Sequence, residues 1–138
     1  MTPFSEYDNR NEYRRLIAGR MASWRVAYKE TELFICADSV MERVALDAVM
    51  ALRRELDAYI ARHPAFKDSL IPLDPLPDAP AAAADMCRAA RAAGVGPMAA
   101  VAGAFAAHVG REILKYSREV IVENGGDIFM KADAARTV

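Results

Sequence analysis

Two glycine-containing segments carry the residue types that most directly indicate ligand binding. One begins Gly-Val-Gly-Pro-Met-Ala at Gly94, and the other is the run from Asn124 to Asp127. Glycine permits close approach and positive φ, while unpaired N–H groups at a helix start attract anions. The Asp127 carboxylate can accept a hydrogen bond from a hydroxyl or ring N–H. We therefore expect a small-molecule nucleotide, with candidate contacts at Gly94, Gly96, Pro97, Met98, Asn124, Gly125, Gly126 and Asp127.

The first segment matches G-x-G-x-x-A, the outline of a dinucleotide-binding fingerprint. That fingerprint requires a strand before its first glycine, but the alanine- and arginine-rich residues 88–93 predict a helix. A Rossmann site is therefore excluded. Gly96 and Pro97 still open a new helix, whose first N–H groups either hold a phosphate or face solvent.

The second segment lies between two strand-like runs, residues 119–123 and 128–131. Asn-Gly in that position is a strong signal for a two-residue hairpin turn, with a positive φ expected at Gly126. A plain hairpin is therefore one interpretation. The second glycine and Asp127 go beyond what such a turn needs, and a ligand cradle is the other interpretation.

The helix predicted over 97–116 carries small residues at three- and four-residue steps. Core packing is the default explanation for this groove, and close approach of a flat ligand is the alternative. A bulkier ridge beside it is expected to face the sheet. The groove residues are Ala99, Gly103, Ala106 and Gly110, and the ridge residues are Val101, Phe105 and Val109.

Strands and a long helix are predicted before these segments. Within residues 13–37, Trp24, Val26 and Tyr28 alternate with more polar neighbours, which indicates an antiparallel pair with one buried face. Ser39 and Glu42 fit a capping box at the start of a helix over 39–62. Its expected buried stripe comprises Val40, Met41, Val44, Ala45, Ala48, Val49, Leu52, Leu56, Tyr59 and Ile60.

Proline-rich residues 70–80 predict an extended connection, followed by a helix over 81–93 that ends at Gly94. We expect residues 1–12 to form a flexible arm and residues 13–138 to form a single domain. Its fold class is α+β, with an antiparallel sheet packed against long helices.

Composition excludes several classes of protein. The 138 residues are 54% hydrophobic and 27% charged with a net charge of −1, which indicates a globular chain without a basic field for nucleic acid. Residues 92–110 lack formal charge but are rich in alanine and glycine, so we expect no membrane span. Cys36 and Cys87 are expected to be buried free thiols. With no signal-peptide pattern at the N-terminus, we expect a cytoplasmic protein.

Residues 122–128, Val-Glu-Asn-Gly-Gly-Asp-Ile, resemble the V-x-x-G-G-D-I signature of the ApbE-like superfamily. The best-known members of that superfamily are magnesium-dependent flavin transferases. Residues 93–103 and 120–129, together with 24–37, more closely resemble an uncharacterised cytosolic branch. The resemblance spans nearly the whole chain from Tyr13. It implies an α+β fold with a cleft for a flavin nucleotide, FAD or FMN.

The chain departs from the transferase pattern at charged positions. The transferase helix reads like A-I-A-K-G-Y-A-V-D, whereas here Gly103 stands at the lysine position and His108 at the aspartate position. A later D-A-x-x-T metal motif is matched in letters by residues 133–137, but six residues after Asp127 is too early. We therefore expect no tight magnesium site. The resemblance also implies further strands after Val138, so the chain is expected to be truncated at its C-terminus.

The leading hypothesis is an ApbE-like protein that binds FAD or FMN between the helix opening at Gly96 and the 124–127 turn. Transfer of FMN from FAD to a protein hydroxyl would need a metal that neutralises the pyrophosphate. The alternative is a non-catalytic module whose glycines serve packing. Its function would then be homo-oligomerisation or partner binding.

Overall fold

A computed structural model describes residues 19–132 of the chain. Residues 1–12, expected to be an arm, the predicted strand start at 13–18, and the D-A-x-x-T letters at 133–137 lie outside this part. In chain order the elements are β1 (Ala22–Tyr28), β2 (Thr31–Ala37), α2 (Glu42–Arg62), α3 (Ala65–Asp68), α4 (Ala81–Ala93), the 3₁₀ helix η1 (Pro97–Ala100), α5 (Val101–Ile113), β3 (Val120–Asn124) and β4 (Asp127–Lys131).

The four strands form one antiparallel sheet in the order β1-β2-β3-β4. Trp24 and Val26 are buried while Arg25 and Ala27 are exposed, so the predicted alternation along β1 is confirmed. The expected α+β fold with an antiparallel sheet is also confirmed. Since β2 pairs with β3, the sheet brings the two predicted hairpins side by side.

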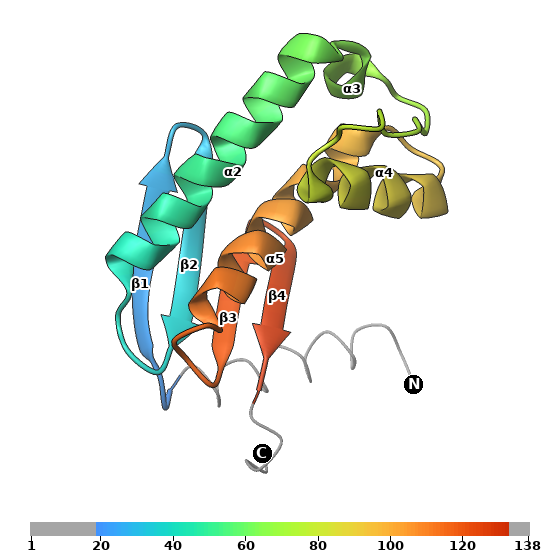
Figure 1. Cartoon of the computed structure of the whole chain (residues 1–138). Helices are drawn as coiled ribbons and strands as arrows, with labels where there is room; N and C mark the ends of the chain where they lie inside the picture. The colour runs from blue at the N-terminus through green and yellow to red at the C-terminus, as the bar shows by residue number, and fades with distance from the viewer. Residues whose placement is uncertain (1–18, 133–138) are drawn as a thin grey trace, which may run out of the picture.

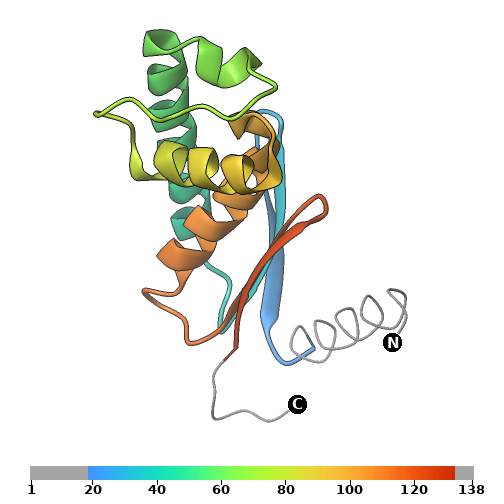
Figure 2. The same cartoon turned by 90° about the vertical axis from the view of Figure 1, so that its right-hand side faces the viewer.

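The helices cover one face of this sheet. Figure 1 shows α2 over the first hairpin and α5 over the second, and Figure 2 shows both helices on the same side of the strands. The helix α5 contacts β3, β4 and α2, while α3 and α4 gather at one end. Strands β1, β2 and β3 and the helices contribute buried residues to the core between these layers, which includes Leu33, Leu52, Tyr59, Phe105, Val109 and Val122.

The start of α2 differs from the sequence prediction. The helix begins at Glu42, its N-cap is Met41, and no side chain caps it, so the predicted Ser39 capping box is wrong. Val40 was expected to be buried but is 52% exposed, and Val44 is only partly buried. Asp38, the residue before the predicted helix start at Ser39, accounts for the later start through its contacts. Its N–H donates to Ser117 Oγ at 2.9 Å and its Oδ2 accepts from the Arg118 N–H at 2.9 Å, which ties the chain to the α5–β3 connection.

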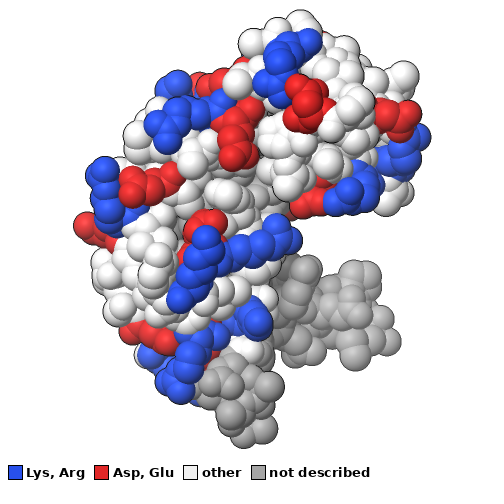
Figure 3. All heavy atoms as spheres, viewed as in Figure 1, with Lys and Arg blue, Asp and Glu red and all other residues white. Residues whose placement is uncertain are grey.

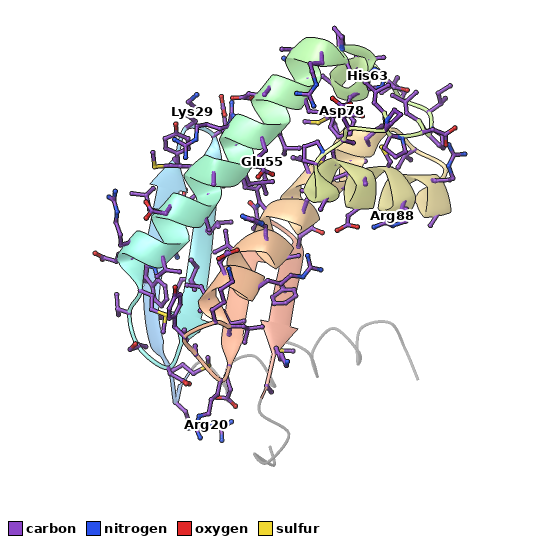
Figure 4. All side chains as sticks on the ribbon, in the orientation of Figure 1. Arg20, Lys29, Glu55, His63, Asp78 and Arg88 are labelled. Carbon is purple, nitrogen blue, oxygen red and sulfur yellow. The ribbon has the colours of Figure 1, made fainter. Side chains whose placement is uncertain are left out.

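The connection over 70–80 has no helix or strand, as predicted, and is held against two helices. The Leu76 N–H donates to Tyr59 Oη at 2.9 Å. Asp78 pairs with Arg62 of α2 at 3.2 Å, and Asp74 pairs with Arg91 of α4 at 2.8 Å. In Figure 4, His63 and Asp78 mark the end of α2 and the adjoining connection.

His63 ends α2, as its position before Pro64 predicts. Its N–H donates to the carbonyls of Tyr59 and Ile60, and its ring lies edge-on to Tyr59 with centroids 5.7 Å apart. These contacts give His63 a structural role at the end of α2. The two cysteines are buried and form no disulfide, also as expected, and burial raises the pKa of the Cys87 thiol.

Candidate functional site

The first glycine segment lies in the connection from α4 to α5. Gly94 ends α4 with a φ of 74°, as predicted, and an added Cβ would meet no atom within 4 Å. Gly96 is different, because a Cβ there would lie 1.8 Å from the carbonyl oxygen of Ser69. The main chain that approaches Gly96 is therefore the protein's own. The predicted helix opening at Pro97 is present as η1, followed by α5.

The second glycine segment is the β3–β4 turn. Asn124 pairs with Asp127, so the two-residue loop is Gly125-Gly126 instead of the predicted Asn-Gly. Gly125 has a φ of 60°, whereas Gly126 is outside the positive-φ region, so the expected strain at Gly126 is wrong. A positive φ at the first loop residue alone is typical of a type II′ turn, which prefers glycine there.

The two residues that flank this turn, Asn124 and Asp127, both lie against α5. Asn124 Nδ2 donates to the Ala102 carbonyl at 3.1 Å. The Asp127 carboxylate lies 3.4 Å from the point where a Gly103 Cβ would be. Farther along α5, a Cβ on Gly110 would lie 2.1 Å from the Phe129 ring. The small-residue groove therefore receives side chains of β4, and the predicted ridge residues Phe105 and Val109 are buried.

A cavity lies on each side of α5. The α4–α5 cavity measures about 440 Å³ and is lined by Ala81, Ala82, Asp85, Met86, Ala89, Ala100, Gly103, Ala104, Ala107, His108, Arg111 and Asp127. The α2–α5 cavity measures about 460 Å³ and is lined by Glu30, Thr31, Arg53, Leu56, Asp57, Ile60, Lys67, Met98, Val101, Ala102, Phe105 and Asn124. Both volumes lie within the range of small-molecule sites.

The structure divides the predicted site residues between these cavities. Asp127 lines the α4–α5 cavity, whereas Met98 and Asn124 line the α2–α5 cavity. The other candidates line neither: Gly94, Gly96, Pro97, Gly125 and Gly126. The two glycine segments therefore do not form one continuous cradle.

The α4–α5 cavity also contains residues that sequence reasoning missed, above all Arg111 and Asp85. One signal could have found Arg111. Gly103, Ala107 and Arg111 follow each other at four-residue steps, so they share one face of α5. Gly103 and His108, the two positions at which the chain departs from the transferase helix, line this same cavity with Asp127.

Positive and negative groups both border the α4–α5 cavity. The Arg111 guanidinium is exposed and lies 5.9 Å from the centre of the Phe129 ring. The first turn of α4, with Ala81 and Ala82, has no side-chain cap, so its N–H groups add a partial positive charge. Asp85 pairs with Arg88, which lies on α4 in Figure 4. Anionic and polar ligand groups therefore both find complementary partners here.

A third, smaller cavity beside His108 lies between α5 and α2. Its lining includes Glu55 and Glu112, and Figure 4 shows Glu55 on the α5 side of α2. Glu112 is engaged by Lys115 at 2.8 Å, and this hydrogen bond raises the pKa of Lys115. Within residues 19–132, no group of three or more histidines, cysteines or carboxylates is arranged to hold a metal ion. The absence of a tight magnesium site stays a prediction.

Two surface properties concern partners. On the face shown in Figure 3, lysines and arginines are interspersed with acidic residues, without one large patch of either sign. Among the described residues, no single helix has both the length and the apolar composition to cross a membrane. The combined segments Ala81–Ala93 and Pro97–Ile113 meet those criteria only together, and they are bent by 104° at their break.

Comparison with known proteins identifies one matching family and several similar proteins that share one name. A family described as "AbpE bacteria" matches residues 14–138. A UPF0280 protein of Methanopyrus kandleri is 47% identical over 116 residues, which are 81% of this chain and 46% of that protein. A UPF0280 protein of Methanocella arvoryzae is 40% identical over 106 residues, 76% of this chain and 43% of that protein. The chain thus spans about half the length of these curated relatives.

Proposed function

The chain belongs to the family described as AbpE bacteria. We propose that it binds a flavin nucleotide, FMN or FAD, in the α4–α5 cavity. One observation carries the proposal. Asp127 belongs to the segment that resembles the ApbE-like signature, Gly103 and His108 stand where the transferase helix has a lysine and an aspartate, and all three line this cavity. The proposed site therefore contains fewer of the residues that the sequence predicted, because Met98 and Asn124 line the other cavity.

The chemistry of the cavity supports a flavin. Small side chains from α4 and α5, including Ala89, Ala104 and Ala107, leave flat apolar walls that suit a planar ring system. Gly103 adds no side chain between these walls and Asp127. The Asp127 carboxylate can accept hydrogen bonds from the ring N–H or from ribityl hydroxyl groups, and Arg111 can hold a phosphate.

We propose binding without FMN transfer. In the transferases that the sequence resembles, a lysine and an aspartate stand where this chain has Gly103 and His108. His108 cannot supply the negative charge that an aspartate offers a metal ion. Transfer of FMN requires that the negative charge developing on the phosphate oxygens be neutralised. A single arginine would neutralise this charge less fully than a metal ion.

Filling the cavity with a larger side chain should weaken flavin binding. Ala89 is an exposed residue of α4 that lines the cavity, so Ala89→Phe should raise the Kd for FMN by at least about tenfold through steric exclusion. The matched control is Ala92→Phe, which places the same ring on an exposed α4 position outside the cavity. Flavin fluorescence titration measures both. Equal FMN affinity in the two variants, or none in the wild type, would reject the site.

Arg111 should distinguish phosphorylated from unphosphorylated flavins. Because a charge-assisted hydrogen bond is worth roughly 1.5–3 kcal/mol, Arg111→Ala should weaken FMN about tenfold or more. Riboflavin, which lacks the phosphate, should bind the variant and the wild type alike. Lys131→Ala removes a charge from an exposed β4 residue that does not line the cavity and serves as the control. Parallel loss of FMN and riboflavin affinity would contradict this role.

A packing module is the second candidate, and two glycines favour it. The Cβ positions of Gly96 and Gly110 are filled by Ser69 and Phe129 of the same chain, so both are explained without a ligand. The neighbouring Leu70 and Ile71 are 87% and 67% exposed and could pack in a homo-oligomer. Sedimentation velocity that shows oligomers, combined with absent flavin binding, would support this candidate over the first.

A further inference from the structure

We propose that the α2–α5 cavity is a second binding site, which takes a small organic anion with an apolar body. This inference is independent of the flavin proposal, because α5 lies between the two cavities. Its apolar walls come from α2, η1 and α5 and include Leu56, Ile60, Met98, Val101 and Phe105. Arg53 of α2 and Lys67 of α3 bring two positive charges to the same cavity.

Arg53 already holds carboxylates in this cavity. Its Nη1 donates to Glu30 Oε2 at 2.5 Å, and its Nε lies 3.3 Å from each oxygen of Asp57. The hydrogen bond from Arg53 lowers the pKa of Glu30. Arg53 has a side chain only 24% exposed, whereas that of Glu30 is 78% exposed, so Glu30 reaches the guanidinium from the solvent side. The Glu30 carboxylate therefore occupies a position that a ligand carboxylate can take.

Lys67 supplies the charge that makes the site selective for anions. Both acidic residues of the lining, Glu30 and Asp57, are engaged by Arg53. Within residues 19–132, Lys67 forms neither an ion pair nor a hydrogen bond through its ammonium group. An anion seated on the apolar wall would satisfy Lys67, whereas Glu30 and Asp57 already share the Arg53 guanidinium. The ligand class is therefore an aromatic or aliphatic carboxylate, or a sulfonate of similar shape.

A pair of fluorescent probes tests this site. 1-Anilinonaphthalene-8-sulfonate is anionic, and N-phenyl-1-naphthylamine has the same aromatic body without the charge. In Lys67→Met, the Kd of the anionic probe should rise roughly tenfold, while that of the neutral probe stays within about twofold of wild type. Glu30→Gln should instead tighten binding of the anionic probe severalfold, because it removes one of the two carboxylates that Arg53 holds. Lys131→Met is the matched control, since Lys131 lies outside both cavities.

The same titrations separate this proposal from the flavin site. Lys67→Met should leave FMN affinity unchanged, and Ala89→Phe should leave binding of the anionic probe unchanged. Near-ultraviolet circular dichroism of each variant checks that the fold is retained, and Lys67 is exposed, so its exchange spares the core. The proposal is overturned if the wild type does not bind the anionic probe. It is also overturned if Lys67→Met and Lys131→Met bind that probe equally.

Discussion

Gly96→Ala is expected to destabilise the fold by about 3 kcal/mol or more, the upper range for an overpacked site. The added Cβ would lie 1.8 Å from the Ser69 carbonyl oxygen and 2.7 Å from its carbon. Both of these are backbone atoms, so no side-chain rotation can relieve the overlap. Either the connection after α3 or the start of η1 has to move. Equilibrium unfolding in urea measures the change in free energy.

Two other glycines separate this clash from backbone strain. Gly94→Ala keeps open space around the new Cβ but retains a φ of 74°, so it should cost about 1 kcal/mol through strain alone. Gly126→Ala has neither problem and should change stability by less than about 0.5 kcal/mol. If Gly96→Ala is no more destabilising than Gly94→Ala, the close approach to Ser69 is not important for stability.

Tyr59→Ala should cost about 3–5 kcal/mol, as large aromatic truncations in cores do. Tyr59 is fully buried and meets the Phe66 ring edge-on, with centroids 5.1 Å apart. It also accepts the hydrogen bond from the Leu76 N–H. One side chain thus joins α2, α3 and the 70–80 connection. Thermal and urea unfolding should both report the loss.

Tyr59→Phe isolates the hydrogen bond from the packing. The ring stays, but the partly buried Leu76 N–H loses its acceptor, which should cost about 1–3 kcal/mol. Limited proteolysis should then cut the 70–80 connection faster than in the wild type. Tyr116→Phe is the control, because Tyr116 is 67% exposed. Similar proteolysis in both variants would show that Tyr59 does not hold this connection.

The flavin proposal depends largely on residues outside the two glycine segments. In that proposal, Arg111 would contact the phosphate and the alanines of α4 would form a wall, while the segments contribute Asp127 to the cavity lining. Two of the glycines, Gly96 and Gly110, are explained by contacts within the chain itself.

The sequence by itself determined the elements and most of their buried faces. The alternation around Trp24 and Val26 predicted the inward face of β1, and the stripe through Leu52, Leu56 and Tyr59 predicted the buried face of α2. Gly94 predicted the end of α4. These features depend on the 2.0- and 3.6-residue periods and on the φ preference of single residues, which neighbours along the chain are sufficient to set.

Only the tertiary structure determined which residues line each cavity. Sequence spacing placed Asn124 and Asp127 in one cradle, but the two residues, although paired across β3 and β4, line different cavities beside α5. The same reasoning missed that the Ser69 carbonyl lies against Gly96. It also missed the hydrogen bond between Asp38 and Ser117, which precedes the observed start of α2 at Glu42. Each of these contacts joins residues far apart along the chain. Their positions are set by how the helices pack on the sheet, and no local period or residue preference contains that information.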